Sequence, residues 1–164
     1  MSSPSLLPPD LAAMMERGVS VNVASRDAAM RPSLMRAVGS SVADGGRAIT
    51  VYVSRRQSRQ LVQDIAATGH IAVVFSEPST HRTVQVKATR ATLRDAEAAD
   101  APVLARYLAS MEHEIQLVGY PPEVPRAMLA HRLEDVVAVT FEPELAYDQT
   151  PGPRAGTRLS GGGA

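Results

Sequence analysis

The residue types best suited to chemistry lie in one short turn between an expected strand and an expected helix. Serine and arginine dominate that turn, which reads Ser54-Arg55-Arg56-Gln57-Ser58-Arg59. The N-terminus of a helix presents free backbone amides, and with arginine and serine donors beside them these amides suit a phosphate group. From spacing alone, solvated arginines on a surface loop are the slightly favoured interpretation. Because the turn lies between a strand and a helix, the phosphate-site interpretation is almost equally favoured.

A second polar stretch lies on an expected strand. The segment Thr83–Leu93 is rich in β-branched residues, and polar residues interrupt it as in a half-buried strand. It follows the apolar run Ile71–Phe75, and the two predict an antiparallel hairpin with a polar, basic tip. One face of the second strand would carry Gln85, Lys87 and Thr89. That face is unusually polar for a core sheet, which indicates a wet surface or a bound ligand.

No metal site is expected from the histidines. The chain has no cysteine, and its four histidines are scattered at positions 70, 81, 113 and 131. Glu112 and Glu114 adjoin His113, but neighbours on a helix point to different faces, and two ligands on one side need a spacing of three or four. His81 falls at the tip of the expected hairpin, where an exposed loop histidine is the favoured interpretation.

The elements that would position these residues are short and mostly strands. Before the hairpin the pattern predicts, in order, a helix at Leu11–Arg17 ended by Gly18, strands at Val19–Ser25, Ser33–Val38 and Ala48–Val53, and a helix at Gln60–Thr68 that stops at Gly69. After the hairpin it predicts helices within Asp95–Val118 and Glu123–Asp135 and a strand over Val136–Tyr147. Five or six strands with short helices between them favour a small antiparallel barrel over a parallel sheet.

Length and composition indicate one domain without nucleic-acid or membrane partners. A chain of 164 residues suits a single domain. Lys+Arg and Asp+Glu balance at 17 each, so net charge gives a nucleic-acid role no support. No apolar run is long enough to span a bilayer, and the N-terminus lacks the pattern of a signal peptide. We expect a cytoplasmic protein whose domain covers residues 1–153, followed by a disordered, Gly- and Pro-rich tail at 154–164.

The run from Ile49 to Ala96 resembles the pyridoxamine 5′-phosphate oxidase-like, FMN-binding split-barrel family. The order of parts agrees: a strand with Pro32 and Arg36, a strand that ends in the Ser/Arg turn, a helix, a strand that ends in Phe75, and a strand that carries Gln85. The resemblance covers residues 19–94 and, less closely, 136–153. It implies a mainly β (α+β) fold, a split β-barrel of antiparallel strands with short flanking helices.

The resemblance also implies a homodimer with FMN at the subunit interface, acting as an oxidoreductase on a small molecule. Carried over by position, Ser58 and Arg59 match the turn that binds the flavin phosphate, with Arg55 and Arg56 as alternatives. Gln85, with Thr83 beside it, matches the residue that contacts the flavin ring. The remaining matched positions lie on the two strands that face the flavin, and they are Met35, Arg36, Val53 and Ser54.

One departure from the family limits the substrate. Pyridoxamine phosphate oxidases end in a segment with tryptophan and an Arg/His pair, whereas this chain has no tryptophan and an unlike C-terminal half. Pyridoxamine phosphate is therefore not the expected substrate. The alternative function is a non-catalytic flavin- or haem-binding protein, in which a histidine such as His81 would ligate haem. The sequence leaves FMN, a deazaflavin and haem open as ligands.

Overall fold

Ten strands and four α-helices make up residues 5–160, the part of the chain that the computed structural model describes. The strands are β1 (Ser20–Arg26), β2 (Pro32–Arg36), β3 (Gly39–Ala43), β4 (Ala48–Ser54), β5 (Ile71–Ser76), β6 (Thr83–Ala88), β7 (Thr92–Asp95), β8 (Val136–Phe141), β9 (Leu145–Asp148) and β10 (Thr157–Arg158). The helices are α1 (Pro9–Arg17), α2 (Arg59–Thr68), α3 (Ala101–Leu117) and α4 (Glu123–Met128), with single 3₁₀ turns at Asp44–Gly46, Ala98–Asp100 and Leu133–Asp135.

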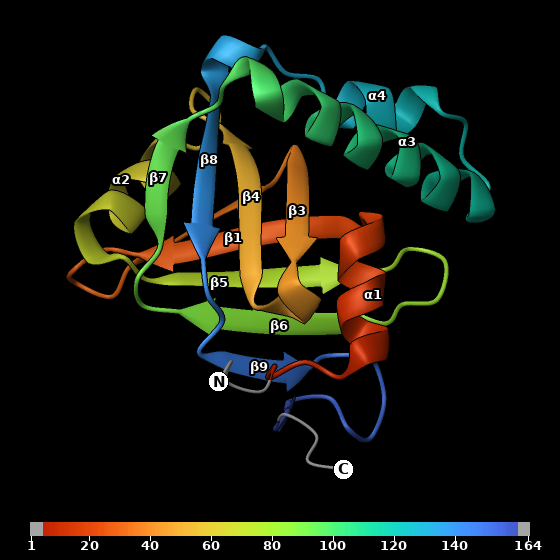
Figure 1. Ribbon diagram of the computed structural model, residues 1–164, viewed down its shortest axis with the longest axis horizontal. Helices are drawn as coiled ribbons and strands as arrows, with labels where there is room; N and C mark the ends of the chain where they lie inside the picture. The colour runs from red at the N-terminus through yellow and green to blue at the C-terminus, as the bar shows by residue number, and fades with distance from the viewer. Residues whose placement is uncertain (1–4, 161–164) are drawn as a thin grey trace.

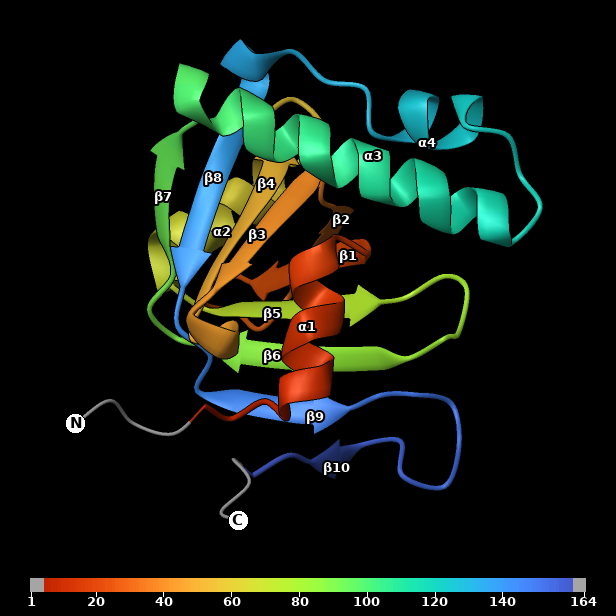
Figure 2. The ribbon, with the colours of Figure 1, turned by 45° about the vertical axis from the view of Figure 1, so that its right-hand side comes forward.

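The strands form two antiparallel sheets that cross each other. The first sheet has the order β10-β9-β6-β5-β1-β2 and the second has the order β3-β4-β8-β7. Figure 1 shows the strands of the second sheet running across those of the first, with α1 beside them and α3 over one end. Figure 2 shows α2 behind the second sheet. The expected mainly β, antiparallel fold with short flanking helices is confirmed.

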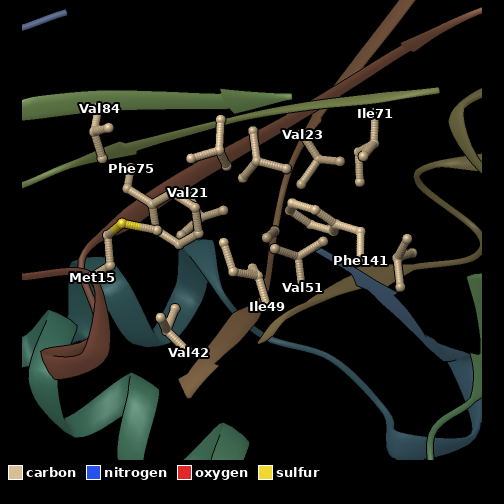
Figure 3. Packing of buried hydrophobic residues seen from close by; sticks show 14 of the residues in the cluster. Met15, Val21, Val23, Val42, Ile49, Val51, Ile71, Phe75, Val84 and Phe141 are labelled. Atoms are coloured by element: carbon tan, nitrogen blue, oxygen red, sulfur yellow. The ribbon is translucent and has the colours of Figure 1, made fainter. Parts of the chain in front are cut away.

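Strict alternation divides three strands of the first sheet into a core side and an outer side. In β1, β5 and β6 every second residue is buried, as a strand with one face on a core requires. Figure 3 shows the buried side chains of both sheets meeting Met15 of α1. The labelled members of this core are Met15, Val21, Val23, Val42, Ile49, Val51, Ile71, Phe75, Val84 and Phe141.

Two of the predicted strands are in fact two strands each. Thr83–Leu93 divides into β6 and β7, and Val136–Tyr147 divides into β8 and β9, with the members of each pair in different sheets. The first break is fixed by a hydrogen bond of 2.9 Å from Ala91 N to Gly69 O. The second break contains Pro143, which cannot donate to a strand ladder. At both points the chain turns a corner from one sheet to the other, and this raises the strand count above the five or six expected.

Two further segments differ from their predictions. The sequence pattern predicts no strand at β3, because Gly39, Ser40 and Ser41 carry no alternating apolar residues. Part of the expected C-terminal tail is also a strand, since Thr157 of β10 pairs with Asp148 of β9. Residues 1–4 and 161–164 lie outside the described residues.

Gly69 has a left-handed backbone conformation that residues with a side chain adopt only with strain. It ends α2 with φ +69°, and a Cβ atom there would lie 2.6 Å from the backbone oxygen of Thr89. We expect Gly69→Ala to destabilise the protein by about 3 kcal/mol, from the left-handed conformation and the backbone clash together. Gly45→Ala is the matched control, because Gly45 has φ +63° and a methyl group added there would meet no atom within 4 Å. Urea unfolding of both variants checks this, and equal losses in the two would contradict it.

A buried carboxylate attaches the start of α3 to the second sheet. Asp100 is only 5% exposed and accepts hydrogen bonds from Tyr52 Oη at 2.9 Å, from Glu97 N at 2.7 Å and from both Nη atoms of Arg94 at 2.7 and 2.8 Å. Burial and the bond to this carboxylate raise the pKa of Tyr52 to about 12. We call these residues the Asp100 network.

None of the helices within residues 5–160 is long and apolar enough to cross a membrane.

Candidate functional site

The Ser/Arg turn connects the end of β4 to the beginning of α2, as predicted. Asp135 holds this turn from a distant part of the chain. Its backbone oxygen accepts from Arg55 N at 2.7 Å, and its carboxylate accepts from Ser54 Oγ at 2.5 Å and from Arg56 N at 3.1 Å. The turn is therefore fixed before any ligand binds. Because the Ser54 hydroxyl already donates to a carboxylate, Ser54 is a weaker candidate for a ligand contact than its position in the sequence suggests.

Ser58 is the strongest candidate for a phosphate contact. It precedes the first residue of α2, yet its side chain does not cap the helix. Its hydroxyl is buried and has no hydrogen-bond partner among the described residues, and the residue is 3% exposed. A buried polar atom without a partner is costly, and such atoms in folded proteins call for an explanation. A ligand oxygen at the beginning of α2 would supply the missing partner.

The arginines of the turn differ in their availability. Arg55 forms an ion pair with Asp95 of β7. In residues 5–160 no ion pair is formed by Arg56 or Arg59, and both are exposed. Arg56 and Arg59 are thus free to approach an anion at the beginning of α2, whereas Arg55 would first leave a carboxylate.

The helix α2 lies along the edge strand β2. Near its middle, Asp64 accepts a hydrogen bond of 2.6 Å from Ser33 Oγ, and at its end Thr68 Oγ1 bonds to Arg26 O at 3.4 Å. The beginning of α2 therefore lies toward the Met35–Arg36 end of β2. Gln60 also bonds to Asp64, at 2.8 Å, and so stabilises the first turn of the helix.

The predicted ring-contacting residues lie on the outer side of the first sheet. The strand register places Gln85 in a row that runs across five strands, and its members are Arg36, Asn22, Val74, Gln85 and Tyr147. We call this the Gln85 row. The Gln85 amide oxygen is 3.5 Å from Gln149 Nε2, and Arg36 Nη1 donates to Ser20 Oγ at 2.6 Å. Thr83 follows on the same side, where Thr83 Oγ1 and Ser76 Oγ are 2.8 Å apart.

The structure divides the predicted site residues into three sets. Arg36, Thr83 and Gln85 face outward from the first sheet. The turn residues Ser54, Arg55, Ser58 and Arg59 lie together at the beginning of α2. The other two point inward: Val53 is fully buried in the core, and Met35 is paired with the core residue Val23. Val53 could meet a ligand through its backbone only.

Sequence reasoning missed the residues that hold the site from afar. Asp135 holds the Ser/Arg turn through Ser54, and Asp64 holds the middle of α2 through Ser33. Nothing in the spacing of the sequence joins either pair. His81, the histidine considered for haem, is exposed at the β5–β6 loop with φ 63°. No group of three potential metal ligands occurs in the part of the chain that the structure describes.

Two crossed antiparallel sheets flanked by short helices define a split β-barrel. The chain has the split-barrel fold of the pyridoxamine 5′-phosphate oxidase-like proteins, and the resemblance stated from the sequence is confirmed at the level of the fold. No protein-family model and no curated protein sequence matches the chain.

Three solved structures illustrate the ligands found among proteins of similar fold. An F420 reductase aligns with a TM-score of 0.58 at 13% identity, over 85% of this chain and 98% of that one. A pyridoxamine 5′-phosphate oxidase-related, FMN-binding protein from Nostoc punctiforme aligns with a TM-score of 0.50 at 13% identity, over 90% and 87%. HutZ, the heme storage protein from Vibrio cholerae, also has a TM-score of 0.50 at 13% identity, over 87% and 94%. Similarity at this identity shows the fold alone.

Proposed function

We propose that the chain binds FMN and acts as an oxidoreductase on a small molecule. The observation that carries this proposal is the buried Ser58 hydroxyl, which lacks a partner among the described residues at the beginning of α2. The first amides of a helix have no partner within the helix, and they favour an anion. With Arg59 and Arg56 beside them, these donors suit the doubly charged phosphate of FMN.

The Gln85 row would receive the flavin ring. Gln85 offers one amide that both donates and accepts, and Val74 beside it offers an apolar surface. Bound FMN would supply the hydride chemistry, and the protein would bind and orient it. Arg36, at the other end of the row, adds a cation on the side of β2. A cytoplasmic location is part of the same proposal.

The direct test combines a titration with an activity assay. FMN fluorescence should be quenched on addition of the purified protein and saturate at one FMN per subunit. NADH or NADPH should then reduce the bound flavin, with bleaching of its visible absorption. A Soret band on addition of haem, without flavin binding, would favour the alternative of a haem-binding protein. Failure to bind FMN at all would overturn the proposal.

A homodimer with FMN at its interface belongs to the same proposal. Leu34 of the edge strand β2 is 69% exposed, and its register partner Ala24 places it on the outer side that also carries the Gln85 row. An exposed leucine next to a ligand surface suits a contact with a second subunit.

Leu34→Glu is expected to weaken the dimer by at least about tenfold, because the charge would be buried at the interface. Size-exclusion chromatography with light scattering at several concentrations measures this. Val124→Glu is the control, because Val124 is 40% exposed and belongs to α4. A wild-type monomer, or a Leu34→Glu variant that dimerises normally, would contradict the proposed interface.

A further inference from the structure

A hollow of about 350 Å³ opens on the outer side of the first sheet, beyond the Gln85 row. The end of β1, the beginning of β5 and the end of β6 line it. This volume lies at the lower end of the range of roughly 300–1,000 Å³ that small-molecule sites occupy. We call it the outer hollow.

Two alanines give the outer hollow its floor. Ala24 of β1 and Ala72 of β5 are register partners on the outer side, and both line the hollow. Their row continues to Leu34 on one side and to Lys87 and Leu145 on the other. The short methyl side chains lie between longer ones, so the floor is apolar and wide enough for a flat group.

Arg26 is held at the rim of the hollow without an acidic partner among the described residues. Its Nη1 donates to Asp27 O at 3.2 Å, and its Nη2 lies 3.2 Å from His70 Nε2. Because a guanidinium only donates, His70 Nε2 must be the unprotonated, accepting nitrogen. His70 Nδ1, 3.0 Å from Thr68 O, then carries the proton. A neutral histidine thus orients the arginine and leaves its charge uncompensated.

Lys87 is the second cation of the outer hollow. Its Nζ lies 5.4 Å from the centre of the Tyr147 ring. In the described part of the chain, neither Lys87 nor Arg26 takes part in an ion pair. Arg26 lies two strands from Lys87 and two residues further along, which is roughly 12 Å at the usual strand dimensions. Side chains of this length can reach a common ligand across that distance.

One carboxylate lines the hollow, and it is already engaged. Glu144 accepts from Thr89 N at 3.0 Å and from Thr89 Oγ1 at 2.8 Å. The hydrogen bonds from Thr89 lower the pKa of Glu144, so this side chain stays ionised. Glu144 also forms an ion pair with Arg90, with Arg90 Nε 3.9 Å from Glu144 Oε1. The charges of Arg26 and Lys87 are therefore left for an anionic ligand.

We propose that the outer hollow binds a small organic anion with a flat apolar body, such as an aromatic carboxylate. Its ring would lie on Ala24 and Ala72, and its carboxylate would lie between Arg26 and Lys87. The site needs no cofactor. The Gln85 row lies two residues further along each strand, about 7 Å away. If the proposed function holds, this anion would lie beside the flavin ring, and the hollow would define the substrate class; that last step rests on the proposed function.

Benzoate and its neutral analogue benzamide test the proposal on the protein without added cofactor. We expect benzoate to bind and to shift the amide resonances of Ala24, Ala72 and Lys87, with benzamide at least about tenfold weaker. Arg26→Gln and Lys87→Gln should each weaken benzoate binding by about fivefold or more. Arg106→Gln, an exposed change on α3, should have no effect.

Equal affinity for benzoate and benzamide would overturn the proposal. So would unchanged benzoate binding in both variants, or shifts confined to another surface. Two variants on different strands keep the test valid if one of them folds poorly. An FMN titration of the same samples separates the two proposals. If the protein binds benzoate and does not bind FMN, only the proposed function is overturned.

Discussion

Arg59→Ala is expected to weaken FMN binding by about 10- to 100-fold, the range for loss of a hydrogen bond to a charged group. Arg59 is the first residue of α2, is exposed, and makes no ion pair in residues 5–160, so its guanidinium is available to the phosphate. Alanine favours a helix as well as arginine does, so the fold should be unaffected. Fluorescence titration with FMN measures the change.

A control variant at another exposed arginine and a series of salt concentrations show whether the effect is specific to Arg59. Arg106→Ala removes an exposed arginine from α3, and FMN affinity should stay as in the wild type. The wild-type affinity should fall as salt rises, and Arg59→Ala should show a weaker dependence on salt, because one charge contact is gone. Unchanged FMN affinity in Arg59→Ala would remove this residue from the phosphate site and bring Arg56 forward.

Asp100→Ala is expected to destabilise the protein by about 2–3 kcal/mol, because it leaves the buried Tyr52 hydroxyl without an acceptor and removes several hydrogen bonds to a charged group. The change would leave the hydroxyl of Tyr52 and the guanidinium of Arg94 without their shared acceptor. Asp95→Ala is the control, next to Arg94 on β7. Asp95 forms an exposed ion pair with Arg55, and its loss should cost less than about 1 kcal/mol. Equal losses of unfolding free energy in the two variants would contradict the role of the Asp100 network.

The same carboxylate predicts how stability depends on pH. The hydrogen bonds from Arg94 outweigh burial and hold the pKa of Asp100 well below its ordinary value of 3.8. A group whose pKa is lowered on folding contributes stability above its unfolded pKa, and that contribution is lost as pH falls below it. The free energy of unfolding should therefore decrease below about pH 4, and Asp100→Asn should show a smaller decrease over that range.

Local patterns are sufficient to predict most elements of the fold. Alternation and end signals indicate β1, β4, β5 and α2 with the glycine that ends it, and the resemblance supplies the way in which they assemble. The corners at Ala91 and Pro143 shift the buried positions from even to odd numbers or the reverse. In such short segments this shift does not show that the chain passes to the other sheet. β3 is not predicted because most of its residues are small or polar, and because its position depends on packing against α3 and β4.

The hydrogen-bond donors of the candidate site can be predicted from the sequence. The distant residues that hold those donors in place cannot. The Ser/Arg turn can be identified because strand, turn and helix adjoin in the sequence. Asp135 contacts Ser54 from 81 residues away, and Asp64 contacts Ser33 of β2 from 31 residues away. Contacts over such separations leave no spacing signal. The same is true of His70 and Arg26, which are 44 residues apart and meet at the outer hollow.

The affinity of the protein for FMN relative to riboflavin tests the central claim most directly. The two ligands share the ring and the ribityl chain and differ only in the phosphate, so their ratio reports the contribution of the turn at Ser58 and Arg59. Several charge-assisted hydrogen bonds predict that FMN binds at least about a hundredfold more tightly than riboflavin. Equal affinities for the two ligands, or binding of neither, would contradict a phosphate site at the beginning of α2.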